Sequence, residues 1–175
     1  MHPVPISGLP SYKKISSVLD YNPKTGDIYW KDNIPKSLHL WMVSGKKAGS
    51  PTSNGYWQVS VFKTHFFAHR LAWFLFYKKW PKFNIDHING NTLDNRIENL
   101  RDVPQQINNQ NKRRAKINNP SGIMGATYRK DDGGTYESSI KAGGRYIYLG
   151  RFKDPQKAGA AYLKAKRQYH PGNTI

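Results

Sequence analysis

The sequence predicts an α+β fold built from two or three small modules. Short stretches of alternating apolar residues, separated by glycine-containing turns, predict antiparallel strands near the N-terminus and again near the C-terminus. Between them, a densely apolar run over residues 68–79 predicts a buried helix. Hydrophobic residues make up 37% of the chain, which suffices for small packed cores but is low for one large core.

The N-terminal region is expected to be rich in strands. Residues 18–30 place two short apolar stretches on either side of an Asn-Pro-Lys-Thr-Gly-Asp turn, which predicts a hairpin. A second turn signal at 53–55 opens residues 56–62, where alternate residues are apolar, as in a half-buried strand. The run 68–79 is too densely apolar for an exposed strand, and it is followed by Trp80-Pro81, where proline stops a helix.

Residues 85–116 are polar and rich in asparagine. Turn formers dominate the first half of this stretch. We expect a helix from about Pro104 to about Ala115, because proline is well placed in a first helical turn. This helix would carry Asn108 and a cluster of cations: Lys112, Arg113 and Arg114. The Asn-, Pro-, Ser- and Gly-rich stretch 118–122 predicts a linker.

The C-terminal region returns to alternation. Residues 126–130, 135–140 and 145–150 are separated by turns that contain Gly-Gly, which predicts three antiparallel strands. Between residues 156 and 169, small residues recur at three-to-four spacing, which predicts a helix that lies close on the sheet. The expected module is a three-stranded antiparallel sheet packed on one helix.

The charge of the chain indicates its partner. The 28 Lys and Arg residues against 11 Asp and Glu residues give a formal net charge of +17, which favours binding to a polyanion such as nucleic acid. No apolar run approaches the roughly 20 residues needed to span a bilayer, and no signal-peptide pattern opens the chain, so we expect no membrane partner. A ribosomal or packaging protein is the plainer alternative.

The strongest chemical signal is the adjacent pair Asp86 and His87. Hydrolysis of a phosphodiester needs a base that activates water and a cation that offsets charge, and this pair supplies a base and a hard oxygen ligand. Neighbouring strand residues point to opposite faces, so the Asn-Gly turn downstream must bend the chain. Asn108 is the expected second ligand, and such ligands suit Mg²⁺ or Mn²⁺. With no cysteine in the chain, no structural zinc is expected.

The segment around this pair resembles a known family. It begins Ile85-Asp86-His87-Ile88-Asn89-Gly90-Asn91, continues Asp94-Asn95-Arg96-Ile97-Glu98-Asn99-Leu100-Arg101 and is followed by Asn108-Asn109-Gln110-Asn111. This string is similar to the HNH motif of phage- and intron-encoded homing endonucleases. Upstream, Tyr21-Asn22-Pro23-Lys24-Thr25-Gly26 and His69-Arg70-Leu71-Ala72-Trp73 are also similar, so the resemblance covers most of residues 18–116.

The resemblance implies a ββα-metal motif, in which a hairpin and a helix clasp one divalent ion. It makes Asp86 and Asn108 metal ligands and His87 the general base. It gives Asn99 the central position, from which the side chain holds the catalytic loop and orients the histidine. Many relatives carry a final His where this chain has Asn108, and a neutral asparagine ligand implies modest metal affinity and magnesium rather than zinc.

The C-terminal region resembles the plant ethylene-response-factor DNA-binding domain, also called the Apetala type. The similar stretches are Tyr128-Arg129-Lys130, Tyr136-Glu137-Ser138-Ser139-Ile140, Tyr148-Leu149-Gly150-Arg151-Phe152 and Ala158-Gly159-Ala160-Ala161-Tyr162. The resemblance implies a sheet that enters the major groove of DNA. The side chains expected to face DNA are those of Arg129, Lys141, Arg145 and Arg151. Tyr136 stands where the plant proteins usually have Trp, so their base preferences do not carry over.

The remaining histidines and cations have plainer interpretations. His69 lies in an aromatic run, where a histidine more often satisfies a core hydrogen bond than binds metal. Four histidines are expected at the surface: His2, His39, His65 and His170. The cations after Asn108 fit a solvated helix face, but beside this motif we expect them to contact phosphates.

These expectations divide the chain into five parts. They are a strand-rich DNA-contacting region (1–82), the HNH motif (83–117), a linker (118–123), the Apetala-type domain (124–170) and a tail (171–175). The expected function is a site-selective, metal-dependent endonuclease that acts as a monomer on double-stranded DNA and nicks one strand at a time. A phage or intron origin would place it in the cytoplasm of a bacterial host cell. The alternative is a non-cleaving, sequence-specific DNA-binding regulator with a degenerate nuclease fold.

Overall fold

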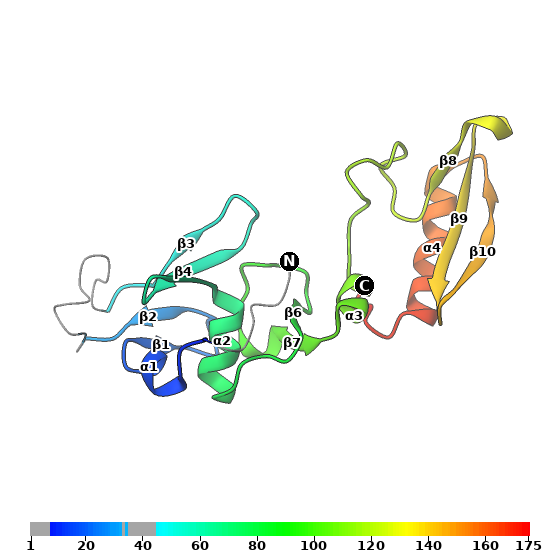
Figure 1. The fold of residues 1–175 in the computed structure, drawn as a ribbon. Helices are drawn as coiled ribbons and strands as arrows, with labels where there is room; N and C mark the ends of the chain where they lie inside the picture. Colours follow the sequence, from blue (N-terminus) through cyan, green and yellow to red (C-terminus); the bar gives the residue numbers. More distant parts are fainter. Residues whose placement is uncertain (1–7, 33, 35–44) are drawn as a thin grey trace. The chain divides into compact units, whose positions relative to one another are not determined.

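The computed structural model describes residues 8–32, 34 and 45–175, so the expected surface residues His2 and His39 lie outside the described residues. It divides the chain into two compact units, the first ending at Gln105 and the second beginning at Gln106. The positions of the units relative to one another are not determined. Both combine helices with antiparallel strands (Figure 1), so the predicted α+β class is confirmed. No helix among the described residues is long and apolar enough to cross a membrane.

The first unit opens with a short helix and the predicted hairpin. α1 (Tyr12–Ser16) is capped by the preceding residue, Ser11, whose hydroxyl accepts a hydrogen bond from Lys14 N at 3.3 Å. β1 (Leu19–Tyr21) and β2 (Ile28–Trp30) pair antiparallel, which confirms the hairpin. The turn between them requires Gly26, which has a φ of +81°, because a Cβ there would lie 2.6 Å from the backbone of residues 95–96. The hairpin turn therefore rests directly on these two residues.

A second sheet follows the hairpin. β3 (Ser50–Pro51), β4 (Trp57–Val61) and β5 (Thr64–Phe67) form an antiparallel sheet in that order. In β4 the alternation predicted over 56–62 is present, since Val59 and Val61 are buried and Ser60 between them is exposed.

One helix covers these strands and completes the main core of the first unit. α2 (Ala68–Tyr77) begins directly after β5 and ends before Lys78, which has a φ of +57°. The helix predicted over 68–79 is thus confirmed, with a slightly earlier end. Its Leu71 and Phe74 belong to a core with residues of α1, the hairpin and β4, among them Ile15, Leu19, Ile28, Val59 and Val61.

A separate strand pair carries the candidate site. β6 (Asn84–His87) and β7 (Leu100–Val103) are antiparallel, with Asp86 opposite Arg101 and His87 opposite Leu100. A 3₁₀ helix, η2 (Ile97–Asn99), leads the intervening loop back into β7. Leu100 and a second strand residue, Ile85, are buried in a small cluster with Ala72 of α2. The strand pair is therefore anchored on that helix.

The second unit begins around α3 (Gln105–Gln110), which is shorter than the helix expected over 104–115. The residues that follow α3 bond to the C-terminal tail. Asn111 accepts a hydrogen bond from the hydroxyl of Thr174, and Arg113 donates to the same hydroxyl at 2.6 Å. Because asparagine has a low helix propensity and bonds readily to other groups, these contacts favour a non-helical path.

The rest of the second unit is the predicted sheet and helix. β8 (Thr127–Arg129), β9 (Thr135–Ala142) and β10 (Arg145–Phe152) are antiparallel, with β9 in the middle and a 3₁₀ turn, η3 (Lys130–Asp132), after β8. α4 (Pro155–Tyr169) packs along one face of this sheet (Figure 1). The prediction of three strands and one helix is confirmed.

Small residues let α4 pack closely, as the sequence predicted. Ala158 and Ala165 are buried, as is Ile140 of β9, the strand on which α4 packs. A Cβ on Gly159 would lie 2.5 Å from a methyl carbon of Ile123, so the preceding loop touches the helix backbone there. At its start, the helix is capped by Asp154, whose carboxylate accepts a hydrogen bond from Gln156 N at 2.7 Å.

The domain boundaries expected from the sequence stay a prediction. Residues 118–123, the expected linker, lie inside the second unit, where Ser121 Oγ donates to Ala126 O at 2.7 Å. In the same stretch, Asn119 Nδ2 donates to Ile123 O at 2.8 Å. The boundary expected at residue 83 lies inside the first unit.

Candidate active site

Asp86 and His87 occupy the last two positions of β6. Both are buried, with 6% and 4% of their surface exposed. The strand ends where the chain turns, because Gly90 N donates to His87 O at 2.8 Å and Gly90 has a φ of +74°. This is the Asn-Gly position at which a bend was expected. Asp86 and His87 are therefore consecutive residues at the end of a strand that is anchored on α2.

The carboxylate of Asp86 is paired with Arg101 across the strand pair. Asp86 Oδ2 accepts a hydrogen bond from Arg101 Nε at 2.8 Å and lies 2.7 Å from Arg101 Nη2. The two residues are opposite each other in the β6–β7 register, which brings the guanidinium to the carboxylate. Any ion that binds this carboxylate has to compete with Arg101.

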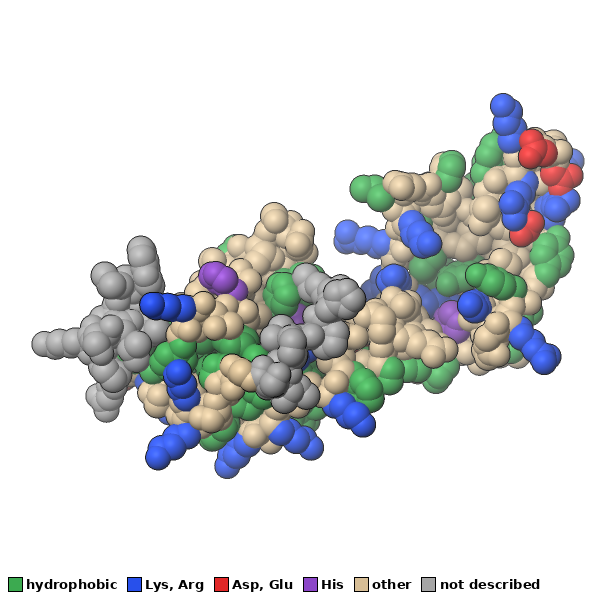
Figure 2. Space-filling model, viewed as in Figure 1, with side chains coloured by type: hydrophobic (Ala, Val, Ile, Leu, Met, Phe, Trp, Pro, Cys, Tyr) green, Lys and Arg blue, Asp and Glu red, His purple; other side chains and the backbone are tan. Residues whose placement is uncertain are grey.

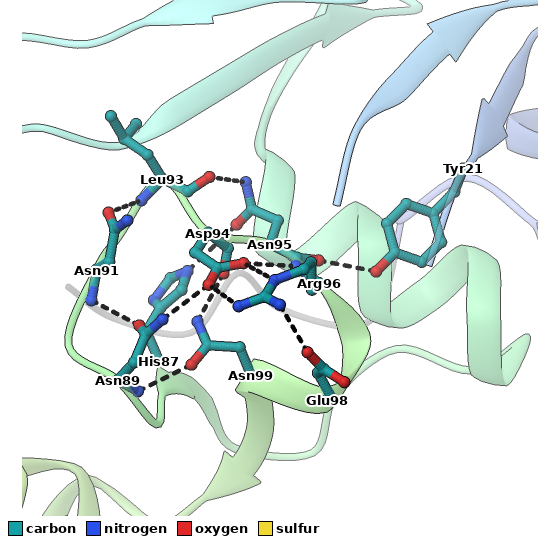
Figure 3. A network of polar contacts seen from close by, with 10 residues as sticks. All are labelled: Tyr21, His87, Asn89, Asn91, Leu93, Asp94, Asn95, Arg96, Glu98 and Asn99. Atoms are coloured by element: carbon teal, nitrogen blue, oxygen red, sulfur yellow. Dashed lines mark hydrogen bonds and ion pairs between the residues drawn. The ribbon is translucent and has the colours of Figure 1, made fainter. Parts of the chain in front are cut away.

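The imidazole of His87 is held on several sides. Its Nε2 lies 3.2 Å from Asn95 Oδ1 (Figure 3). The ring of His69 meets it edge-on with centroids 5.2 Å apart, and the ring of Tyr56 lies at 6.3 Å. Burial lowers the pKa of His87, while the hydrogen bond with Asn95 and the charge of Asp86 act in the opposite direction. The net shift is downward, so the ring is neutral and able to accept a proton at neutral pH.

His69 forms part of the wall around His87. Its ring stacks on that of Phe67 at 5.5 Å and an interplanar angle of 7°, and it lies 5.5 Å from the ring of Tyr56. Burial, followed by the charges of His87 and Arg70, holds the pKa of His69 well below its ordinary value. The residue is buried, as expected, but its place beside His87 was not predicted.

Asn99 ties together the loop between β6 and β7 (Figure 3). Its Oδ1 accepts a hydrogen bond from Asn89 N at 2.8 Å, and its Nδ2 donates to Asp94 O at 2.7 Å. Its carbonyl oxygen accepts a third hydrogen bond, from Ile88 N at 2.8 Å. These are the contacts that a loop-holding residue needs. The amide that contacts the ring of His87, however, belongs to Asn95.

An ion pair between Asp94 and Arg96 also stabilises this loop. The carboxylate of Asp94 accepts hydrogen bonds from Arg96 Nε at 2.8 Å and from Asn89 Nδ2 at 2.7 Å, and it lies 2.7 Å from Arg96 Nη2 (Figure 3). The bond with Arg96 contributes most to lowering the pKa of Asp94 to about 2. The loop beside His87 is therefore held by a charge pair as well as by Asn99.

The two expected metal ligands belong to different units. Asp86 lies in the first unit and Asn108 on α3 in the second, so their separation is not determined. Within the described parts of the chain, no group of three or more His, Asp or Glu side chains is suited to holding a metal ion. Mg²⁺, however, often binds through one or two carboxylates and completes its shell with water and substrate phosphates. The carboxylate oxygens of Asp86 and the amide oxygen of Asn108 are each hard donors of the kind that such an ion takes.

A comparison with models of protein families identifies the stretch that holds this site. Residues 66–110 match the model of HNH endonucleases. This stretch, the HNH segment below, contains Asp86, His87, Asn99 and Asn108. The match supports a nuclease that acts on DNA. Searches of curated proteins and of solved structures found no match.

Two residues of the HNH segment contact the candidate site but were not identified from the sequence. Arg101 had a usable signal, because pairing the strands on either side of the loop would have placed it opposite Asp86. Asn95 had none, because its side chain reaches His87 through the path of the loop rather than through a regular spacing.

The cations expected to contact DNA lie beyond the HNH segment, in the second unit. Lys112, Arg113 and Arg114 follow α3 instead of lying on it, and their side chains are exposed. The carbonyl of Lys112 accepts a hydrogen bond from Lys166, a buried lysine of α4. Together with the bond from Arg113 to Thr174, this contact anchors the basic stretch 112–114 to α4 and to the C-terminal tail.

Three of the four expected sheet cations share the sheet face that α4 leaves open. Lys141 alternates with the buried Ile140, and Arg151 lies opposite Glu137, on the same side as Lys141. Arg129 reaches Glu137 at 3.0 Å and belongs to that side too. Arg145 lies opposite Ala142, which is two residues from Ile140 and points to the same face of β9. Arg145 is therefore on the side of the sheet that α4 covers.

Acidic side chains accompany two of these cations. Arg129 pairs with Glu137, and Arg151 pairs with Asp132 of η3. On the face drawn in Figure 2, the acidic side chains of the second unit gather at the end where η3 lies. Exposed ion pairs contribute little free energy, so both arginines can exchange these partners for phosphates.

Proposed function

We propose that this protein is a metal-dependent endonuclease that hydrolyses phosphodiester bonds of double-stranded DNA. The observation that carries the proposal is the buried imidazole of His87 directly after the buried carboxylate of Asp86, within the HNH segment. A base whose pKa lies near or below neutral pH is ready to take a proton, and a neighbouring oxygen donor suits a cation.

In the proposed reaction, His87 takes a proton from water while the water oxygen forms a bond to phosphorus and the bond to the leaving oxygen breaks. A divalent ion, held by Asp86 and Asn108 when bound, would offset the charge that develops on the phosphate and the leaving oxygen. Mg²⁺ is the proposed ion, with Mn²⁺ as the substitute. Asn99 holds the loop beside His87 in place through its hydrogen bonds with Asn89 and Asp94.

The second unit would hold the DNA. The cations on the open sheet face and the basic stretch after α3 supply positive charge outside the HNH segment: Lys112, Arg113, Arg114, Arg129, Lys141 and Arg151. Phosphate contacts of this kind fix the register of a protein on a duplex, while base contacts select a site. We infer an Apetala-type DNA-binding role for this unit and, from it, a site-selective, homing-type enzyme.

One HNH segment per chain also sets the proposed outcome of cleavage. A monomer with one active site cuts one strand at a time, so we propose a nickase that works as a monomer on DNA. If the gene is carried by a phage or an intron, the enzyme acts in the cytoplasm of a bacterial host cell.

A second candidate function is a DNA-binding regulator that does not cleave. The observation that favours it is the pairing of Asp86 with Arg101, because a carboxylate already neutralised by a guanidinium is a poorer ligand for a cation. The basic second unit serves either function.

A nicking assay distinguishes the two functions. Supercoiled plasmid that carries a library of inserts is incubated with the protein and Mg²⁺, and the nicked circular form is followed on a gel. The endonuclease converts supercoiled to nicked DNA with Mg²⁺ and stops in excess EDTA. The regulator binds the same plasmid in a gel shift but produces no nicked form with Mg²⁺ or Mn²⁺.

A further inference from the structure

Asn95 contacts the proposed base through one side of its amide. The residue is 4% exposed, and its Oδ1 lies 3.2 Å from Nε2 of His87 (Figure 3). Its Nδ2 points the other way and donates to Leu93 O at 3.5 Å. Because a carbonyl only accepts hydrogen bonds, the NH₂ end of the amide belongs on the Leu93 side and the oxygen on the His87 side.

This orientation decides which ring nitrogen of His87 carries the hydrogen. An amide oxygen only accepts, so Nε2 must donate and the neutral ring carries its hydrogen there. The basic lone pair of this tautomer lies on Nδ1. A histidine that acts as a base needs its lone pair on the nitrogen that meets the water, and a hydrogen bond to the other nitrogen is what sets this.

The backbone of Asn95 is fixed from behind by the N-terminal hairpin. Tyr21 Oη donates to Asn95 O at 2.8 Å, and Ile97 N donates to Pro23 O at 3.2 Å. Burial raises the pKa of Tyr21, so its phenol stays protonated and donates. The turn at Gly26 lies against the same backbone, where a Cβ would be 2.6 Å away. The amide thus has little freedom to move.

The walls of the site also restrict the ring of His87. His69 meets it edge-on, at an interplanar angle of 86°, and the ring of Tyr56 is tilted at 50° to it with centroids 6.3 Å apart. If the ring rotated so that Nδ1 and Nε2 exchanged places, the hydrogen bond from Nε2 to Asn95 would break. The buried amide oxygen of Asn95 would then lose this donor.

We propose that Asn95 is a positioning residue that fixes the tautomer of His87 with hydrogen on Nε2 and the basic lone pair on Nδ1. The catalytic part of this inference rests on the proposed endonuclease function, whereas the tautomer does not. Residues that orient a functional group in this way typically contribute about 10–100-fold to activity.

The tautomer is measured directly in the wild-type protein. Long-range ¹H–¹⁵N correlation spectra of ¹⁵N-labelled protein, recorded where the imidazoles are neutral, distinguish a protonated ring nitrogen from one with a lone pair. The spectrum of a His87→Gln variant identifies the signals of His87 among those of the six histidines. We expect hydrogen on Nε2. Hydrogen on Nδ1 would overturn the inference without any variant of Asn95.

Variants of Asn95 then test the cause. Asn95→Leu keeps the size of the side chain and removes the acceptor, so the signals of His87 should shift towards a mixture of tautomers. Asn95→Asp keeps an acceptor oxygen and should retain hydrogen on Nε2. Asn91→Leu makes the same change in the same loop, at an exposed residue that bonds to Leu93 N, and should leave the spectrum as in the wild type. A wild-type signature in Asn95→Leu would contradict the assigned role.

Kinetics separates this inference from the proposed function. In single-turnover cleavage, Asn95→Leu should lower the rate about 10–100-fold while the Kd for DNA stays unchanged. If the wild type does not cleave DNA but shows the expected tautomer and the shift in Asn95→Leu, the endonuclease proposal fails and the tautomer inference holds. Unchanged cleavage in Asn95→Leu would remove the catalytic part.

Discussion

Arg101 holds the carboxylate of Asp86 with two nitrogens, Nε at 2.8 Å and Nη2 at 2.7 Å from Oδ2. The side chain of Asp86 is 7% exposed and that of Arg101 is 24% exposed, so little water screens the pair. The proposed metal site and this ion pair share one carboxylate. The pair therefore stabilises the ends of β6 and β7 and, at the same time, sets a cost for binding a cation.

Replacing Arg101 with Leu is expected to destabilise the protein by about 2 kcal/mol, because Asp86 loses a charged hydrogen-bond partner in a buried place. Urea unfolding measures this cost. The double variant Asp86→Asn, Arg101→Leu should cost less than the sum of the two single variants, because it leaves no buried charge without this partner. Additive costs would show that the two side chains do not interact in solution.

The stability of the loop beside His87 should depend on pH through Asp94. The bonds with Arg96 and Asn89 lower the folded-state pKa of Asp94 to about 2 from an ordinary value of 3.8. A lowered pKa contributes stability that is fully present above about pH 4 and is lost as the pH falls through about 2. Asp94→Asn should therefore lose less stability than the wild type between these pH values in denaturant unfolding. Parallel losses in the two proteins would contradict this account.

The proposed ligands make opposite predictions for two substitutions. Asp86→Ala should abolish cleavage at every Mg²⁺ concentration, whereas Asn108→Asp should still cleave, because it supplies an oxygen ligand with more charge. Asn109→Asp adds the same charge to an exposed neighbour on α3 and should leave the Mg²⁺ dependence unchanged. Titration of Mg²⁺ in a cleavage assay compares all four proteins. Cleavage by the wild type in excess EDTA would exclude the proposed metal dependence.

The proposed DNA contacts of the second unit are best tested in the full chain. Removing residues 121–175 would also remove Thr174 and Lys166, which hold the basic stretch after α3. Lys141→Gln should lower the slope of log affinity against log salt by roughly 0.9, the value for one lost phosphate contact. Arg145→Gln removes the same charge from the other side of the sheet and should change the slope less. Equal slopes for the two variants would show that the open sheet face is not the DNA surface.

The fold could be predicted from the sequence wherever the pattern was local. The hairpin at Gly26, the apolar α2 and the small-residue face of α4 all follow from spacing within a short window, and the structure contains each of them. The helix after Pro104 was predicted too long, because its end depends on bonds between Asn111 and Thr174, far apart in the sequence.

The candidate site was predicted in part for the same reason. Asp86, His87 and Asn99 stand out in one continuous motif, and the structure places all three in or beside the β6–β7 pair. Arg101 and Asn95 required knowledge of strand register and loop path, which composition and spacing do not contain. Whether Asn108 joins Asp86 at one ion stays a prediction.

The central claim is that His87 is the base of a DNA-cleaving site. The measurement that tests it most directly is single-turnover cleavage of duplex DNA with Mg²⁺ by the wild type and by His87→Ala, with the Kd for DNA measured in parallel by gel shift. The account predicts that His87→Ala lowers the cleavage rate by about 10²–10⁴-fold, the usual contribution of a general base, with an almost unchanged Kd. Cleavage by His87→Ala at the wild-type rate would contradict it.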